Sequence, residues 1–417
     1  MNATLKQPVQ LSGIACRRLR TPEHTLDNVY VEFDGPRIHI LGDYNSVAIP
    51  PGAFNAREED LTVIPGLVDV HVHGAGGIDF LNADLEGLKY ISSVAARGGA
   101  TTMVATTTLA AEDENLENFA EFIRILRSTG TLPYNGGTAD RTVSTLPGTR
   151  ITGIHLEGPF LNPERRGAFT DRFLRLPDRK VAEKVMEICG DLLLKVTMAP
   201  ELPGGEELVE VFTSGSTPVE VSLGHTTANY ALGMKVFENP HARQITHCFN
   251  AMTGLHHRAA NLITAALMDE RISLEIIGDG LHVAAPVVQL LHRITGAKRL
   301  IGITDGASSA GSPPGSIFEA FSGQARVGAD SGVRRVNDNV LVGSAALMSD
   351  IFLRLQHMAD IPFEDALLMC TYNPAKSINR ADQVGRIDKD QRADFVVLRN
   401  EQEVAATIRD GMLVHQE

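Results

Sequence analysis

The chain has 417 residues, which is long enough for one large barrel with an appendage, or for two domains, around a sizeable core. Hydrophobic residues make up 43% of it and charged residues 21%, as in ordinary water-soluble globular proteins. The formal net charge of −13 argues against a nucleic-acid partner and against an anionic membrane surface, although a local basic cluster could still bind an anionic small substrate.

The cysteine spacing and the first residues of the chain indicate a cytoplasmic protein. Four scattered cysteines form no CxxC pair, so neither a structural zinc site nor a disulfide framework is expected. The N-terminal residues lack a basic segment followed by an apolar run, so we expect no signal peptide. Because no stretch approaches about 18 continuous apolar residues, we expect no membrane span.

Both ends of the chain contain short segments in which apolar and polar residues alternate. Asp34-Gly35 separates two such segments near the N-terminus, and Asp410-Gly411 separates two near the C-terminus, as in β-hairpins. Two β-rich ends around a different middle predict one small β-sandwich domain built from both. We expect its N-terminal part in residues 1–61 and its C-terminal part in residues 378–417.

The middle of the chain, residues 62–377, alternates predicted strands and helices. The expected strands are residues 61–73, 100–107, 151–157, 192–200, 217–224, 244–250, 273–279 and 299–305. The expected helices are residues 84–97, 112–128, 178–190, 205–213, 227–238, 258–269 and 284–295. Eight βα units in a row predict an α/β fold with a (β/α)8 TIM-like barrel, and a doubly wound sheet is the structural alternative.

Two parts of the middle do not follow the βα pattern. Residues 129–150 are rich in Thr, Gly and Pro and are expected to form a long connecting loop. After the eighth strand, residues 345–358 and 363–369 are expected to be helical. Residues 372–378 are expected to lead back to the terminal β segment.

Metal-binding residue types gather at the C-terminal ends of the predicted strands, where barrel enzymes build their sites. Side chains alternate along a strand, so the two histidines of an HxH pair project to the same face. Nitrogen and oxygen donors in this ratio suit Zn, Fe or another divalent transition metal. The residues concerned are His71, His73, His155, Glu157, His225, His247 and Asp305.

A structural role must be weighed against metal binding for each of these side chains. A single histidine in a barrel is more often a hydrogen-bonded core residue than a ligand, and the HxH pair alone leaves the two interpretations about even. Five histidines and Glu157 at the ends of four strands, with Asp305 on a fifth, are hard to explain without a metal. The sequence therefore predicts a metal site.

Several motifs in combination resemble the N-acetylglucosamine-6-phosphate deacetylase family of the amidohydrolase superfamily. Residues 65–73, PGLVDVHVH, look like the opening barrel strand of that superfamily. The other matching motifs are HLEGPF at 155–160, APE at 199–201, GHT at 224–226, THCFNAM at 246–252, DGLHV at 279–283 and TDG at 304–306. The resemblance extends from about residue 61 to about residue 398.

The resemblance implies a metal-dependent hydrolase of amino-sugar catabolism. Its substrate would be an N-acetylhexosamine 6-phosphate, either the glucosamine or the galactosamine isomer, from which it removes the acetyl group. Asp305 corresponds to the catalytic aspartate of the family, which would take a proton from the attacking water and deliver one to the departing amine.

The metal ligands carry over from the same motifs. The resemblance implies a principal site made by Glu157, His225 and His247. Because this chain has His71 and His73, the resemblance leaves room for a second ion, which Glu157 would share with the first. We therefore expect one or two divalent ions, Zn before Fe or Mn.

The family also implies a homodimer and a set of sugar contacts. Arg258 would reach the neighbouring subunit's site and bind the phosphate, because a guanidinium suits phosphate geometry; a surface charge at a helix start is the alternative. Residues 341–343 are expected to be a loop that closes the sugar pocket. The residues expected to contact the substrate, besides Arg258, are Asn250, Ala251, His282, Phe169, Leu341, Val342 and Gly343.

Two positions depart from the family pattern. Phe169 stands where the family usually has a substrate-binding histidine, and a phenylalanine cannot donate a hydrogen bond to the acetyl or sugar oxygen. Ala259-Ala260-Asn261 follow Arg258, where the family commonly has Glu-Pro-Gly. Both changes lie in the sugar and phosphate region and leave the metal ligands intact. We therefore expect the chain to keep the hydrolytic chemistry, whereas these two changes can alter which substrate it prefers.

Two alternatives remain open. One is a different amidohydrolase, acting on another N-acyl compound or on a cyclic amide; many of those bridge two metals with a carboxylated lysine on the fourth strand. Lys195 lies on that strand but is expected to be a surface residue at its start, so Glu157 is the better bridge. His155 is expected to have a structural role. The other alternative is a degenerate barrel that acts as a binding or scaffold protein.

Overall fold

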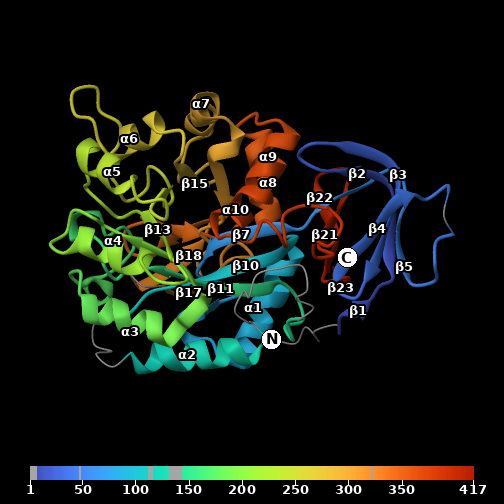
Figure 1. The fold of residues 1–417 in the computed structure, drawn as a ribbon, viewed down its shortest axis with the longest axis horizontal. Coiled ribbons are helices and arrows are strands. Elements are labelled where there is room, and N and C mark those ends of the chain that lie inside the picture. Colours follow the sequence, from blue (N-terminus) through green and yellow to red (C-terminus); the bar gives the residue numbers. More distant parts are fainter. Residues whose placement is uncertain (1–6, 47, 111–115, 131–142, 321–322) are drawn as a thin grey trace.

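A computed structural model describes residues 7–46, 48–110, 116–130, 143–320 and 323–417. It contains two large β structures, an eight-stranded parallel sheet surrounded by helices and a nine-stranded mixed sheet beside it (Figure 1). Among the described helices, none combines the length and the apolar character needed to cross a bilayer. The predicted strands at the ends of the chain and the predicted βα units in the middle therefore form separate sheets.

The parallel sheet follows chain order, so that consecutive strands are neighbours. Its strands are β7 (Leu67–Val72), β10 (Ala100–Thr107), β11 (Arg150–Glu157), β12 (Leu193–Met198), β13 (Glu220–Leu223), β14 (Gln244–Ile245), β15 (Ser273–Ile277) and β16 (Leu300–Ile303). Nearly all of their residues are buried, as expected for parallel strands that are covered on both faces. The predicted barrel architecture is confirmed.

The residues that follow β16 close the barrel against β7. The backbone N–H of Asp305 donates to the carbonyl of His71 at 3.0 Å, and the N–H of His73 donates to the carbonyl of Gly306 at 2.8 Å. An isolated parallel bridge between Val72 and Gly306 lies at the same junction. Closing the barrel therefore brings two predicted ligands beside the predicted catalytic aspartate.

Helices connect most of the barrel strands, and three more follow β16. They are α1 (Leu85–Arg97), α2 (Glu117–Ser128), α3 (Arg179–Cys189), α4 (Gly205–Thr213), α5 (Tyr230–Val236), α6 (Leu262–Met268), α7 (Ala285–Thr295), α8 (Met348–His357), α9 (Phe363–Cys370) and α10 (Tyr372–Ser377). The predicted starts at Asp84 and Asp178 are confirmed, since each side chain accepts an N–H of the first turn. Gly98 and Gly190 end α1 and α3, also as predicted.

Both ends of the chain contribute to the mixed sheet, where the blue and red strands lie side by side in Figure 1. All nine strands belong to one connected sheet around its own apolar core. They are β1 (Val9–Gln10), β2 (Gly13–Arg20), β3 (Thr25–Asp34), β4 (Arg37–Asp43), β5 (Ala53–Ala56), β6 (Leu61–Pro65), β21 (Phe395–Arg399), β22 (Glu403–Arg409) and β23 (Met412–Gln416).

Residues 61–73, predicted as one strand, are two strands in different sheets. β6 pairs with β21 of the mixed sheet, and β7 opens the barrel. Gly66 separates them and lies against the neighbouring strand, where a Cβ atom would come within 2.2 Å of the Thr101 hydroxyl. A continuous apolar run does not indicate that its two halves join different sheets, so the prediction of a single strand is wrong.

The segment after β16 also differs from expectation. It contains a four-stranded antiparallel sheet made of β17 (Ile317–Ala320), β18 (Gly323–Val327), β19 (Gly332–Arg335) and β20 (Leu341–Ser344). The predicted loop at residues 341–343 is therefore a strand. Residues 372–378, expected to be a connection, contain α10. Of the predicted loop 129–150, residues 131–142 lie outside the described part, and Arg150 already belongs to β11.

A buried charge network joins the start of β11 to the C-terminal strands. The guanidinium of Arg150 lies 2.5 Å from the Asp394 carboxylate and 2.7 Å from that of Asp410, which Arg392 also contacts at 2.7 Å. Burial would raise the pKa of Asp410, but Arg150 and Arg392 outweigh burial and lower it to about 2. The barrel and the mixed sheet are thus held together by paired buried charges.

We expect Asp410→Asn to lower the free energy of unfolding by about 3–5 kcal/mol, because it leaves two buried guanidinium groups without a full counter-charge. Urea unfolding at neutral pH measures the loss. Glu121→Gln is the control; it removes an exposed ion pair with Arg124 and should cost less than about 1 kcal/mol. A loss for Asp410→Asn as small as that of the control would show that the network does not stabilise the junction.

The same network predicts a pH dependence. The folded-state pKa of Asp410, about 2, lies below its ordinary value of 3.8. The stabilisation that ionised Asp410 provides is therefore fully present at a pH above its ordinary pKa of 3.8, and it is lost as the pH falls through the folded-state pKa of about 2. The stability difference between the natural protein and Asp410→Asn should shrink over that range.

Candidate metal centre and active site

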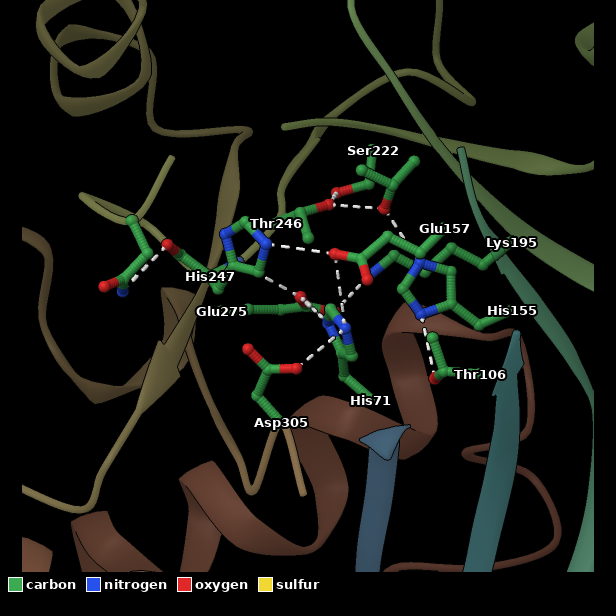
Figure 2. Close-up of polar contacts among 12 residues, drawn as sticks. His71, Thr106, His155, Glu157, Lys195, Ser222, Thr246, His247, Glu275 and Asp305 are labelled. Atoms are coloured by element: carbon green, nitrogen blue, oxygen red, sulfur yellow. Dashed lines mark hydrogen bonds and ion pairs between the residues drawn. The ribbon is translucent and has the colours of Figure 1, made fainter. Parts of the chain in front are cut away.

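Five side chains from four barrel strands, or from the residues just after them, lie together where the strands end; Figure 2 labels three of them, His71, Glu157 and His247. His71 and His73 belong to β7 and the residue after it, Glu157 ends β11, and His225 and His247 follow β13 and β14. They form two groups of three potential ligands, and in each group the ligand atoms lie within 4.8 Å of one another. Glu157 belongs to both groups.

The carboxylate of Glu157 is the centre of the cluster. One oxygen lies 3.0 Å from Nε2 of His247 and 3.3 Å from Nε2 of His225, and the other lies 3.1 Å from Nε2 of His73. The Nε2 atoms of His225 and His247 are 3.0 Å apart. Such a convergence of buried donor atoms is costly unless protons or a cation lie between them.

The donor set fits divalent transition metal ions. Nε2 of His71 is buried and has no hydrogen-bond partner among the described residues. Its Nδ1 lies 3.1 Å from Glu275, and Nδ1 of His225 lies 2.8 Å from the carbonyl of Arg165. Contacts of this kind orient an imidazole so that its other nitrogen can bind a metal. The residues therefore fit an ion at each of the two groups.

The protonation of the cluster follows from its neighbours. Burial would raise the pKa of Glu157, but the surrounding histidines outweigh burial and hold the pKa well below its ordinary value. Burial would lower the pKa of His73, but Asp305 and Glu157 outweigh it and raise the pKa to about 9. Without a metal ion, therefore, His73 carries a proton at neutral pH.

Asp305 follows β16 and faces the same cluster. Its Oδ1 lies 3.3 Å from Nε2 of His71 and 3.4 Å from Nε2 of His73. Burial would raise the pKa of Asp305, but His71 and His73 outweigh it and lower the pKa, so the carboxyl group is ionised at neutral pH. Its side chain remains 17% exposed and borders the cavity described below, so it can exchange a proton with a bound molecule.

Three of these residues have an unusual backbone conformation. His225, His247 and Asp305 have φ values of 49°, 28° and 44°, in the left-handed region that residues other than glycine rarely adopt. Each lies two residues after the end of a barrel strand, and such strain is concentrated at functional sites. At Gly224, a Cβ atom would lie 2.7 Å from Cβ of Thr246, so only glycine allows these strand ends to approach so closely.

A cavity of about 490 Å³ opens over the cluster, a size that suits a small-molecule ligand. At its floor lie His73, Glu157, His225, His247 and Asp305. Its lining also includes all but one of the residues that the sequence predicted to contact the substrate, namely Phe169, Asn250, Ala251, His282, Leu341, Val342 and Gly343.

Phe169 makes one wall of the cavity apolar. Its ring centroid lies 5.4 Å from that of His225, and the side chain packs with Leu161 and Phe173. Only 6% of the residue is exposed. The wall beside a metal-binding histidine therefore offers van der Waals contact and no hydrogen bond, as the substitution for histidine led us to expect.

Arg258 is the predicted substrate residue that does not line the cavity of its own chain. It is exposed and lies in the segment between β14 and α6. The expected helix start at residue 258 is wrong, because α6 begins at Leu262, where the side chain of Asn261 accepts the N–H of Thr264 and caps the helix.

Several cavity residues were not predicted. They lie on connecting segments, including the short 3₁₀ helices η1 (Phe80–Asn82) and η3 (Asp171–Phe173), and on β17. Gly167 and Ala168 directly precede the predicted Phe169, but no motif marks the other segments, so the sequence contains no signal that would have found their residues. The residues are Asp79, Leu81, Asn82, Gly167, Ala168, Arg172, Phe173, Ala307, Ser308, Glu319 and Val340.

Lys195 is buried, so its prediction as a surface residue is wrong. Its ammonium group forms an ion pair with Glu275, and neither side chain is exposed (Figure 2). β12 begins only two residues earlier, but residues at its start already face the barrel interior. The acidic residue in the otherwise apolar core of β15 was the available signal for a buried partner.

His155 is in neither group of potential ligands. Its Nδ1 lies 3.2 Å from the hydroxyl of Thr106, and its Nε2 lies 2.8 Å from that of Thr197. Burial, with the positive charges of His71 and Lys195 nearby, holds its pKa well below the ordinary value. The contacts place this neutral imidazole in the hydrogen-bonded barrel interior beneath the cluster.

The model of the amidohydrolase family matches residues 62–414. The N-acetylglucosamine-6-phosphate deacetylase of Bacillus subtilis (strain 168) is 30% identical over 352 residues, which cover 84% of this chain and 84% of that protein. The N-acetylgalactosamine-6-phosphate deacetylase of Escherichia coli O157:H7 is 27% identical and covers 92% of this chain and 94% of its own length.

A solved structure is similar over nearly the whole chain. It is a variant of N-acetyl-D-glucosamine-6-phosphate deacetylase from Mycobacterium smegmatis in complex with N-acetyl-D-glucosamine-6-phosphate. The TM-score is 0.82 at 26% sequence identity, with 98% of this chain and 100% of that chain covered. The chain therefore belongs to the amidohydrolase family, within its N-acetylglucosamine-6-phosphate deacetylase branch.

Proposed function

We propose that the protein hydrolyses the amide bond of an N-acetylhexosamine 6-phosphate and releases acetate and the amino sugar phosphate. The observation that carries the proposal is the joint presence, in one cavity, of two groups of metal-binding side chains and the ionised Asp305. The names of the relatives support both the glucosamine and the galactosamine substrate.

One or two divalent ions are the proposed cofactors, with Zn preferred over Fe and Mn. Glu157, His225 and His247 would hold the principal ion, and His71, His73 and Glu157 a second one. When bound, such an ion lowers the pKa of a water molecule and polarises the amide carbonyl. An intact ligand set and an intact Asp305 speak against a degenerate barrel that only binds or scaffolds.

Asp305 is the proposed proton carrier. Its ionised carboxylate accepts the proton that the attacking water loses and then donates it to the leaving nitrogen. The side chain is partly open to the cavity, and its Oδ1 is already close to His71 and His73. Because the side chain borders the cavity, one carboxylate can serve both proton transfers.

The sugar would be held by groups on the cavity wall. Nδ1 of His282 lies 2.7 Å from the Asp279 carboxylate, a contact that orients the ring. Asn250 and Ala251 offer polar backbone and amide groups beside it, and β20 borders the opening. Because Phe169 replaces a hydrogen-bonding group, another N-acyl compound is the second candidate substrate.

The phosphate would be bound by Arg258 of the second subunit in a homodimer. Its exposed position outside its own cavity supports this arrangement. We also propose a cytoplasmic location, since the four cysteines are free and buried, as in a reducing compartment.

Metal binding should release protons, because histidine ligands must be neutral and the pKa of His73 without an ion is about 9. The affinity for zinc should therefore rise as the pH is raised toward that value. Calorimetric titration of the apo protein in buffers of different ionisation enthalpy counts the protons. His73→Asn should release fewer, and an absence of proton release from the natural protein at neutral pH would contradict the assignment.

Asp305→Asn should lower the turnover number by at least about a hundredfold, because the amide cannot accept the proton of the attacking water. Steady-state kinetics at saturating zinc measures the change, and metal analysis of the same sample shows whether the ions are retained. Turnover close to that of the natural protein, with full metal content, would remove Asp305 from the proton transfer.

A panel of N-acetylated sugars with and without 6-phosphate tests the substrate. The phosphorylated sugars should have a much higher kcat/KM, and Arg258→Ala should remove most of that preference by raising KM. Mixing the Arg258→Ala and Asp305→Asn proteins tests the dimer, since each hybrid dimer contains one site with both groups intact. Recovery of activity on mixing is the expected result, whereas equal rates with both classes of sugar would eliminate the phosphate contact.

A further inference from the structure

We propose that Glu275 and Lys195 are a positioning pair that holds His71 ready for the second metal ion, so that this pair decides whether the chain binds two ions or one. The proposal rests on the metal-dependent function proposed above. It concerns residues that no motif marked and that lie beneath the cluster, outside the substrate cavity.

The carboxylate of Glu275 connects both groups of ligands. One oxygen, Oε2, lies 3.1 Å from Nδ1 of His71 and accepts the backbone N–H of His247 at 3.3 Å. The other, Oε1, forms the ion pair with the ammonium of Lys195 (Figure 2). The backbone carbonyl of Glu275 accepts the N–H of Cys248 at 2.8 Å, so the same residue also supports the turn after β14.

These contacts determine how the His71 ring can serve as a ligand. A carboxylate only accepts hydrogen bonds, so Nδ1 of His71 must donate to Glu275. In the neutral imidazole, the lone pair then remains on Nε2. That atom lies 3.5 Å from Glu157 and 3.3 Å from Asp305, inside the cluster. The contact with Glu275 thus orients the ring and leaves Nε2 facing the cluster, where it can bind an ion.

The ion pair with Lys195 holds the carboxylate of Glu275 below the cluster. Two charged side chains without solvent contact in the barrel interior cost more free energy than apolar side chains of the same size. Lys195 comes from β12 and Glu275 from β15, so the ion pair spans the barrel interior. The ammonium holds one carboxylate oxygen and leaves the other for His71. A pair that only filled the barrel would not need the contacts with His71 and His247.

The test compares metal binding by the natural protein with that of Glu275→Gln and of the double variant Glu275→Gln/Lys195→Met. The double variant removes both charges together, so no unpaired charge is left in the interior. Each apo protein is titrated with Co²⁺, whose absorption reports the ligand geometry, and with Zn²⁺ against a chelator. Both variants should keep one tight ion and bind the other about 10–100-fold more weakly.

Two controls separate positioning from general damage to the fold. Glu220→Gln removes a different buried carboxylate of the barrel, whose partners are His241 at 3.0 Å and Asn379 at 3.0 Å, and should leave both affinities unchanged. In a His71→Asn background, Glu275→Gln should have no further effect on ion binding, because it acts through that ring. Urea unfolding of each variant shows that the protein tested is folded.

The outcomes distinguish this proposal from the proposed function. If the natural protein binds no divalent ion, the metal-dependent function fails. If it binds only one ion, or if the folded double variant binds two with unchanged affinities, the positioning role is overturned while the principal site stands. An equal loss of both ions in Glu275→Gln would also overturn it, since the pair would then support the whole cluster and not the His71 site.

Discussion

The burial of Glu157 among histidines is the constraint on which the rest of the structure depends. Its side chain is 3% exposed, so its charge must be compensated by nearby groups. Those groups come from strands β7, β13 and β14, which only a closed barrel brings together. The closing hydrogen bonds between β7 and the residues after β16 also place Asp305 beside the cluster. The hydrogen bonds that close the barrel therefore also bring Asp305 to His71 and His73.

The sequence predicts what depends on local pattern. Apolar periodicity located the barrel strands, capping residues such as Asp84 located helix starts, and polar residues at strand ends indicated the ligands. It did not reveal the ion pair of Lys195 with Glu275, because these residues are 80 positions apart and neither belongs to a recognisable motif. The four-stranded sheet of β17–β20 was missed for the related reason that its strands are short and irregularly spaced.

The candidate metal ligands and the cavity wall lie on different parts of the fold. The candidate ligands lie on barrel strands or within two residues of their ends, where neighbouring strands fix the backbone on both sides. The cavity wall includes segments outside the barrel strands, among them the loop with Phe169, the 3₁₀ helix with Arg172 and the strand β20 with Leu341. Connecting segments tolerate substitution better than barrel strands do. Substitutions in the cavity wall, for example at Phe169, can therefore alter the preferred substrate while the barrel that positions the candidate ligands stays the same.

The charge network at the far end of β11 has a consequence for biosynthesis. The strand that ends in Glu157 begins at Arg150, whose carboxylate partner Asp410 lies 260 positions later in the chain. A polypeptide made from its N-terminus therefore exposes the third barrel strand long before the residue that neutralises its first side chain exists. The junction between β11 and the C-terminal strands can therefore form completely only after the chain has been synthesised past Asp410.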